Sequence, residues 1–459
     1  MLCIINFTVI INLIYTIMLF NINKTKIKST DYGQYCFYIG TLLLSSTTFL
    51  AGVFYLISLV ISFSRETNFI KKDKWNLSLF VCTIILILSS INIWITTNNS
   101  KIYEVLKSES WDSSAIWISL FNWIPLFLSF YGFQKYINSE SQRIRFAKCL
   151  FLGTIPVLIS IILQKWFQIF GPFEYLNGLV VFYLKETDPL VGFAGLFNNP
   201  NYAGLWLSAS LPFCFLMFKI YKYKKLKLSF IITITISTIY CILSTNSRNS
   251  FIGLFIASFI MISTKFLFTF LLVFVILYFL ITGLSSITFF SSLGINEFLD
   301  EIIIFKKLFQ TNYFNKLEFA RIDIWTKAIN LISERPLLGW GATTFPILYL
   351  LRGGIETAQH THSMPLEIAQ TNGIPVAIIL VCFVTLLFLK SWKVIFTKNK
   401  NSESIINKAW ISSLLIIIIS HMSDVTYYDG RVSLLIWVLL AGLKCILDED
   451  KIKKINNLS

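Results

Sequence analysis

Long apolar segments recur along the whole chain and are separated by short polar stretches. Many of them approach 20 residues, the length that a helix needs to cross a hydrocarbon core of about 30 Å. Their apolar residues run continuously instead of alternating, which excludes a membrane β-barrel. The pattern therefore predicts an all-α, polytopic membrane protein with about 12 transmembrane helices, at 3–20, 36–63, 77–97, 115–133, 146–170, 202–218, 228–244, 250–264, 266–288, 366–389, 409–428 and 431–447.

Composition agrees with this class. Only 14% of the residues are charged and the mean hydropathy is +0.70, whereas soluble domains carry about 25% charged residues. The net charge of +15 comes largely from short loops between apolar runs, so we expect membrane lipids and no nucleic acid as partners. The eight cysteines lie in or beside apolar runs without a CxxC pair, which indicates buried apolar residues rather than disulfides.

Basic residues orient the chain, because loops rich in Lys and Arg face the cytoplasm. With both termini inside, the predicted topology places residues 390–408 in the cytoplasm and 289–365 in the periplasm. The loop with Lys24, Lys26 and Lys28 disagrees, so the orientation of the first hairpin stays open. Four loops agree, with Arg65, Lys71, Lys72 and Lys74; Lys135, Arg143, Arg145 and Lys148; Lys219, Lys222, Lys224, Lys225 and Lys227; and Lys390, Lys393, Lys398, Lys400 and Lys408.

The segment 289–365 is much longer than a typical connection, and such loops are usually functional. We expect it to form a small helical cap on the membrane surface. The pattern predicts a helix within residues 317–334, one face of which carries Arg321, Trp325, Ala328 and Ile332. A proline disfavours helical geometry in the residue before it, so this helix should end at Arg335–Pro336.

Three polar clusters precede predicted helices that run inward from the outer face. They are Asn198–Asn201, Ser247–Asn249 and His360–Ser363. Helix N-termini present free N–H groups and the positive end of the helix dipole, which favours anions and phosphates. Each cluster alone is typical of an ordinary helix cap, with Ser363 in that role. Their coincidence on one side, with Arg248 and Arg321, indicates a functional site.

Two other groups have simpler interpretations. His360 and His362 raise the alternative of a metal site, but zinc needs a third protein ligand. Glu356 is near without a recognised ligand spacing, so we expect no metal and no cofactor. His421 and Asp424 lie one turn apart in the predicted eleventh span, and we interpret them as a structural pair within the bundle.

Several stretches resemble one known family. They are Gly-Leu-Phe-Asn-Asn-Pro-Asn-Tyr-Ala at 195–203, Thr-Asn-Ser-Arg at 245–248, Arg321 with Trp325, Arg-Pro-Leu-Leu-Gly-Trp-Gly at 335–341, and His362 with Gly373. Together they resemble the bacterial O-antigen ligase family, within a superfamily that also holds O-antigen polymerases. One departure is Ile252, where the family usually has Leu. The resemblance covers about residues 195–375.

The resemblance implies a membrane glycosyltransferase on the periplasmic face of the bacterial inner membrane. The donor would be a glycan on undecaprenyl pyrophosphate, and the acceptor a sugar hydroxyl of the lipid A-core. If the protein is a polymerase, the acceptor would be another glycan. An O-antigen polymerase and a protein O-oligosaccharyltransferase therefore remain alternatives. A transporter for an anion such as bicarbonate is less favoured, because transporters bind near the bilayer midplane and these clusters lie at helix ends.

Chemistry suggests a role for each residue. His362 is the expected general base, since histidine titrates near neutral pH. Arg248 and Arg321 are expected to hold the pyrophosphate, because a guanidinium grips phosphate through its planar fork. Asn198, Asn201, His360 and Trp325 are expected substrate-binding residues. We divide the chain into N-terminal helices (1–194), a ligase-like core (195–390) and C-terminal helices with a cytoplasmic tail (391–459). The oligomeric state stays open.

Overall fold

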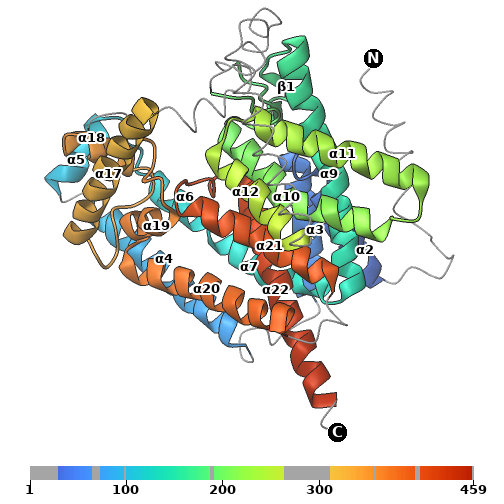
Figure 1. Cartoon of the computed structure of the whole chain (residues 1–459). Helices are drawn as coiled ribbons and strands as arrows, with labels where there is room; N and C mark the ends of the chain where they lie inside the picture. The colour runs from blue at the N-terminus through green and yellow to red at the C-terminus, as the bar shows by residue number, and fades with distance from the viewer. Residues whose placement is uncertain are drawn as a thin grey trace, which may run out of the picture.

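A computed structural model describes residues 29–64, 73–97, 100–186, 191–262, 311–354, 358–397 and 404–456 (Figure 1). These residues are mostly helical, and their one small sheet is an antiparallel pair, Phe173–Tyr175 (β1) and Val180–Phe182 (β2). The predicted all-α class is confirmed. The helices are α2 Ser29–Leu43, α3 Thr48–Phe63, α4 Lys74–Thr96, α5 Lys101–Ser108, α6 Ala115–Phe121, α7 Ile124–Gly132, α8 Gln134–Ile137, α9 Glu140–Phe167, α10 Pro200–Ile220, α11 Lys225–Ser244, α12 Arg248–Met261, α17 Thr311–Glu334, α18 Phe345–Leu351, α19 Met364–Asn372, α20 Ile374–Thr397, α21 Ile405–His421 and α22 Gly430–Asn456.

Membrane-spanning character is evident in the described part of the chain. Seven helical segments are long and apolar enough to cross a membrane, and α3, α12 and α21 are shorter apolar helices. One of the seven is broken at Asn122–Trp123 into α6 and α7. The predicted spans 3–20 and 266–288 lie outside the described residues. A polytopic membrane protein is therefore confirmed.

The predicted second span, 36–63, is wrong as a single helix. It consists of two antiparallel helices, α2 and α3, separated by residues 44–47. Gly33 lies against Ile61 near one end of the pair, and Gly40 lies against Tyr55 near the other. Because the pair turns back, the start of α2 and the end of α3 lie at the same end.

Two other predicted spans have different limits. The tenth begins at Ile374, because Gly373 ends α19 with a φ of +91° and starts a new helix direction. The eleventh ends at His421, and the following residues up to Asp429 form a loop. Val425 and Tyr427 in this loop are buried. Their apolar character extended the predicted span, but burial of a loop side chain does not require a helix.

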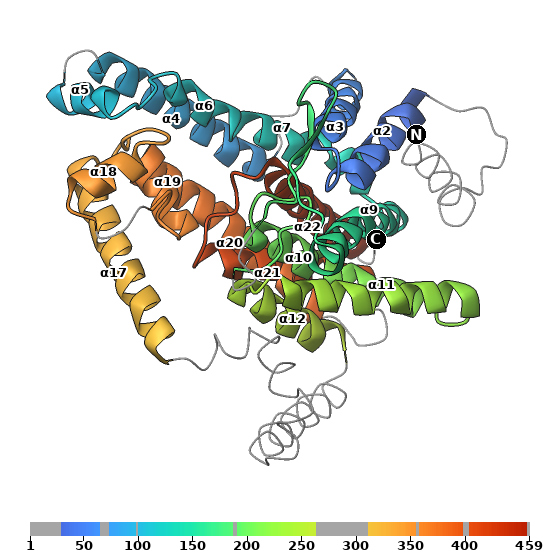
Figure 2. The same ribbon diagram turned by 90° about the horizontal axis from the view of Figure 1, so that it is seen from above.

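The side chains form two hydrophobic cores, which we call the bundle and the cap. The bundle core contains most of the spanning helices. The cap core joins α5, α17, α18 and the segment after α17, and Figure 2 shows these three helices grouped at one edge of the molecule. The aromatic members of the cap core are Tyr103, Trp111, Trp325, Trp340, Phe345 and Tyr349. The cap expected from the sequence is therefore a packed unit.

Small residues bring α10 and α12 close together in the bundle. A Cβ atom at Gly204 would lie 2.0 Å from Ser250 Oγ, and one at Gly253 would lie 2.8 Å from Ser208 Cβ. Such contacts let helix backbones approach closely, as is common in membranes. They place the first turn of α12, which begins with Arg248, beside the first turn of α10.

Candidate active site

Arg248 is presented by a tight turn between α11 and α12. Asn246 occupies this turn with a φ of +51°, a left-handed conformation that asparagine tolerates better than most residues. The preceding Thr245 is fully buried, and a Cβ atom at Gly192 would lie 2.2 Å from its carbonyl oxygen. The Thr-Asn-Ser-Arg stretch therefore reverses the chain and places Arg248 as the first residue of α12.

Arg321 approaches the same place from the cap. It lies half-buried on α17, and within the described residues it makes no hydrogen bond or ion pair. Burial lowers the pKa of Arg321, as does the nearby charge of Arg248, while the charge of Asp424 raises it. An arginine stays protonated in proteins. Arg321 therefore lies within electrostatic range of both Arg248 and Asp424.

His360 and His362 lie in the loop between the cap and α19. Thr361, between them, is fully buried, and its carbonyl oxygen accepts a hydrogen bond from Trp325 Nε1 at 3.0 Å. His362 has a φ of +51°, which is uncommon outside glycine and asparagine. Strained backbone of this kind clusters at functional sites. Trp325, expected to bind substrate, thus has an intramolecular partner that fixes the histidine loop.

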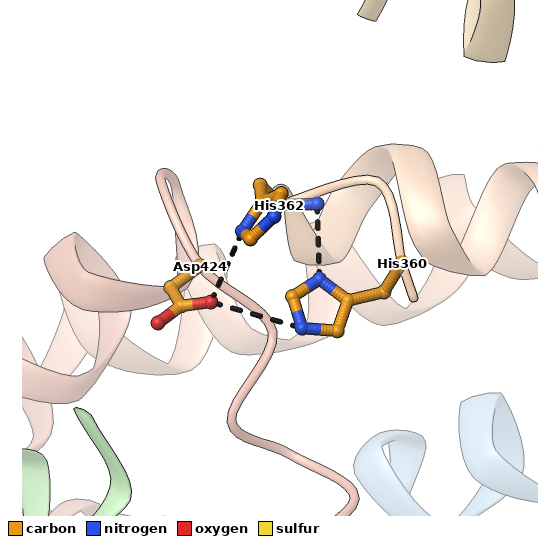
Figure 3. A group of neighbouring side chains, drawn as sticks. All are labelled: His360, His362 and Asp424. Atoms are coloured by element: carbon orange, nitrogen blue, oxygen red, sulfur yellow. Dashed lines mark hydrogen bonds and ion pairs between the residues drawn. The ribbon is translucent and has the colours of Figure 1, made fainter. Parts of the chain in front are cut away.

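Asp424 joins both histidines (Figure 3). Its Oδ1 lies 3.4 Å from His362 Nδ1 and 4.0 Å from His360 Nε2. The Nδ1 atom of His362 is buried, yet the side chain as a whole keeps a third of its surface exposed. The open part of the ring is therefore on the side away from Nδ1. A proton on Nδ1, facing Asp424, leaves Nε2 free to accept a proton.

The electrostatics of the group favour a charged Asp424. Burial alone would raise the pKa of Asp424, but the contact with His362 and the charges of both histidines lower it overall. Burial lowers the pKa of His360 to about 4, helped by His362 and opposed by Asp424. Nδ1 of His360 accepts the backbone N–H of His362 at 3.3 Å. His360 is therefore a neutral support for the loop at neutral pH.

His421 and Asp424, which the sequence pairs, share no hydrogen bond or ion pair in the described part of the chain, although Asp424 still lies within electrostatic range of His421. His421 Nε2 pairs with Thr426 Oγ1 at 2.9 Å, and Asp424 faces the histidine loop. The direct histidine contacts of Asp424 are therefore both in that loop. Ser423, beside Asp424, donates a hydrogen bond to Asn249 Oδ1 at 2.9 Å. The loop of Asp424 is thereby tied to the first turn of α12, next to Arg248.

The same three side chains are also able to hold a metal ion. The ligand atoms of His360, His362 and Asp424 all lie within 4.8 Å of one another. Catalytic zinc sites use three protein ligands. The third ligand that seemed to be missing from the sequence is therefore present in Asp424, while Glu356 lies outside the described residues. Whether the protein binds a metal ion at these three residues therefore has to be measured.

The asparagines expected to bind substrate lie at the start of α10, whose first turn lies beside that of α12. Asn199 is the N-cap of α10 and accepts the backbone N–H of Asn201 at 2.8 Å. Asn198 is exposed and Asn201 is half-buried. Their contacts with substrate remain predictions. Ser363 occupies the N-cap position of α19, but its side chain makes no capping hydrogen bond.

The spacing from His362 to Gly373 corresponds to one short helix. α19 fills the interval, and Gly373 ends it. A Cβ atom at Gly373 would lie 2.2 Å from Leu337 O, and one at Gly339 would lie 2.5 Å from Thr371 O. The stretch 335–341 therefore packs directly against the end of α19. These two glycines allow close backbone contact between that stretch and the C-terminal end of α19.

The fold and the site define a multi-pass membrane protein in which Asp424 lies beside His362 and within electrostatic range of Arg321, which is itself near Arg248. Residues 228–381 match the family described as O-antigen ligase. The resemblance found in the sequence motifs is thus confirmed, and the match supports a membrane glycosyltransferase of the O-antigen ligase and polymerase type. No curated protein matches the chain. The matched region contains Arg248, Arg321 and His362, whereas Asp424 lies beyond it.

Proposed function

We propose that this protein transfers a glycan from undecaprenyl pyrophosphate to a sugar hydroxyl of the lipid A-core, on the periplasmic face of the bacterial inner membrane. The observation that carries the proposal is that Asp424, which contacts His362, lies within electrostatic range of Arg321, and that Arg321 lies near Arg248. The family match supports the reaction class, and the basic loops support the orientation.

The transfer needs a base for the acceptor hydroxyl. In the proposed reaction, Nε2 of His362 takes the proton as the hydroxyl oxygen attacks the anomeric carbon. Asp424 orients the ring through Nδ1 and stabilises the imidazolium that forms. The negative charge of Asp424 is maintained by its lowered pKa. The new glycosidic bond forms as the bond from the anomeric carbon to the phosphate oxygen breaks.

The leaving group is lipid-linked pyrophosphate, which departs with an additional negative charge. In the proposed reaction Arg248 and Arg321, which lie within electrostatic range of each other, bind it through charge-assisted hydrogen bonds. Arg248 also lies at the start of α12, where the helix dipole favours an anion. Preorganised positive groups stabilise developing charge without reorganisation. Asn198 and Asn201 are proposed donor contacts from the start of α10.

A purified assay tests the proposal directly. The protein is reconstituted with an undecaprenyl-pyrophosphate glycan and a rough lipopolysaccharide acceptor, with and without EDTA. We expect lipopolysaccharide to gain the glycan and the rate to be unchanged by EDTA, because His362 and Asp424 act without a metal. A rate that falls with EDTA and recovers with zinc would instead show that His360, His362 and Asp424 hold an ion.

The polymerase alternative rests on the same family description and has a distinct outcome. A deletion strain of a ligase loses all long chains from an intact core, whereas a polymerase mutant keeps a core carrying one repeat unit. An unchanged lipopolysaccharide ladder would contradict both activities. Transfer to a protein in the purified assay would favour the oligosaccharyltransferase.

A further inference from the structure

A single buried carboxyl group contacts both loops that make the His362–Asp424 pair. Glu367 lies in the first turn of α19 and is buried. Its Oε2 accepts the backbone N–H of Thr361 at 2.9 Å, between the two histidines. Its Oε1 accepts the hydroxyl of Tyr428 at 3.4 Å. Tyr428 belongs to the same loop as Asp424.

The histidine loop has few other anchors. The carbonyl oxygen of Thr361 is held by Trp325, and its hydroxyl donates to Ser363 O at 2.9 Å. Only the contact with Glu367 fixes the N–H of this buried residue. Without a partner, that N–H would remain unsatisfied away from water, which is unfavourable. The loop would then turn, and the left-handed His362 would lose the restraint on its backbone.

We propose that Glu367 is a positioning residue that sets the distance between His362 and Asp424. It acts through Thr361 on one side and through Tyr428 on the other. Its effect on turnover rests on the proposed function, whereas its effect on the surroundings of His362 does not. Glu367 holds the two loops in register through its contacts with Thr361 and Tyr428.

Variants separate this role from simple stability. Glu367→Ala removes both contacts, so we expect kcat to fall about tenfold to a hundredfold, as for other supporting residues. The KM for the donor should change little, because the arginines are untouched. Glu367→Gln should keep most of the activity, since its amide oxygen can accept from Thr361 and its amide can donate to the Tyr428 oxygen. Glu334→Ala is a matched control, because Glu334 only pairs with Arg352 at the surface.

A double-mutant cycle identifies the partner through which Glu367 acts. Neighbouring groups that work together show non-additive effects. In an Asp424→Asn background, Glu367→Ala should therefore cost much less than in the wild type. An equal loss of kcat in both backgrounds would overturn the proposal, since it would mean that Glu367 does not act through the pair.

A second measurement needs no transfer activity. The rate at which diethyl pyrocarbonate modifies His362 at one fixed pH, followed by peptide mass spectrometry, reports how accessible the ring is. We expect Glu367→Ala to raise this rate, because the histidine loop loses its contact at Thr361, whereas Glu367→Gln and Glu334→Ala should leave it unchanged. A wild-type rate in Glu367→Ala would refute the positioning role, even if the assay of the proposed function had failed.

Discussion

The bundle and the cap are stabilised in different ways. The bundle is packed by apolar side chains and close contacts of small residues, as between α10 and α12. The cap combines aromatic side chains with polar partners: Trp340 Nε1 donates to Leu331 O at 2.7 Å, and Arg335 stacks 4.5 Å from the Trp340 ring centroid. Its surface also carries the Arg352–Glu334 ion pair. The apolar packing of the bundle is typical of a region surrounded by lipid, and the polar contacts of the cap are typical of a region in contact with water.

The site depends on both regions. The bundle contributes Arg248 and Asp424, the cap contributes Arg321 and Trp325, and His362 lies between them. A centre divided in this way is sensitive to how the cap sits on the bundle. Substitutions of site residues in either region should therefore lower turnover without removing side chains from a hydrophobic core. The sizes of their effects show how much each region contributes to the site.

The largest effect is expected at His362, which lies between the bundle and the cap. His362→Ala removes the proton acceptor, so transfer should fall by about 10²–10⁴-fold while the protein stays in the membrane. His360→Ala should retain some activity, because His360 supports the loop and is neutral at neutral pH. Lipopolysaccharide ladders at matched expression measure both. A normal ladder from the His362 variant would show that another group takes the proton.

The next largest effect is expected at Asp424, the residue of the pair that the bundle contributes. Asp424→Asn keeps the size of the side chain but removes the charge that stabilises protonated His362. We expect kcat to fall by about 10²-fold or more, with donor affinity nearly unchanged. Single-turnover kinetics with the purified protein separate the two quantities. If only donor affinity changed, Asp424 would instead belong to the binding of the anion.

The arginines compare the two regions directly. Lysine keeps the charge but loses the planar fork. Arg248→Lys in the bundle and Arg321→Lys in the cap should each weaken donor use by about tenfold to a hundredfold, which corresponds to the loss of one charged hydrogen bond. Protein level should fall far less than turnover. Near-normal donor affinity and turnover in Arg321→Lys would leave that residue a structural role only.

The smallest effect is expected at Trp325, which the cap contributes. Trp325→Phe keeps an aromatic ring in the cap core but removes the hydrogen bond to Thr361 O. A neutral hydrogen bond contributes about 0.5–1.5 kcal/mol, so the loss of turnover should stay below about tenfold. Thermal unfolding of the purified variant provides the control. A loss as large as that of His362→Ala would mean that Trp325 also contacts substrate.

The sequence alone determined the class of protein and much of its local structure. Hydropathy placed most spans, because each helix satisfies its own backbone hydrogen bonds within a lipid environment. The amphipathic pattern around Arg321 and the end of α17 before Pro336 were likewise predictable, since both depend on neighbours along the chain. Motif spacing identified His362, Arg248 and Arg321 as one group, and the family match covers all three.

Tertiary structure decided the rest. The turn between α2 and α3 and the loop after His421 contain several Ser, Thr and Asp residues, but both are short and lie between apolar segments, so hydropathy averaged over a span does not reveal them. The sequence paired Asp424 with His421 because the two are close along the chain. The direct histidine contacts of Asp424 are with His360 and His362, which come from another loop. A contact between segments far apart in sequence leaves no local signal, because packing of the cap against the bundle brings them together.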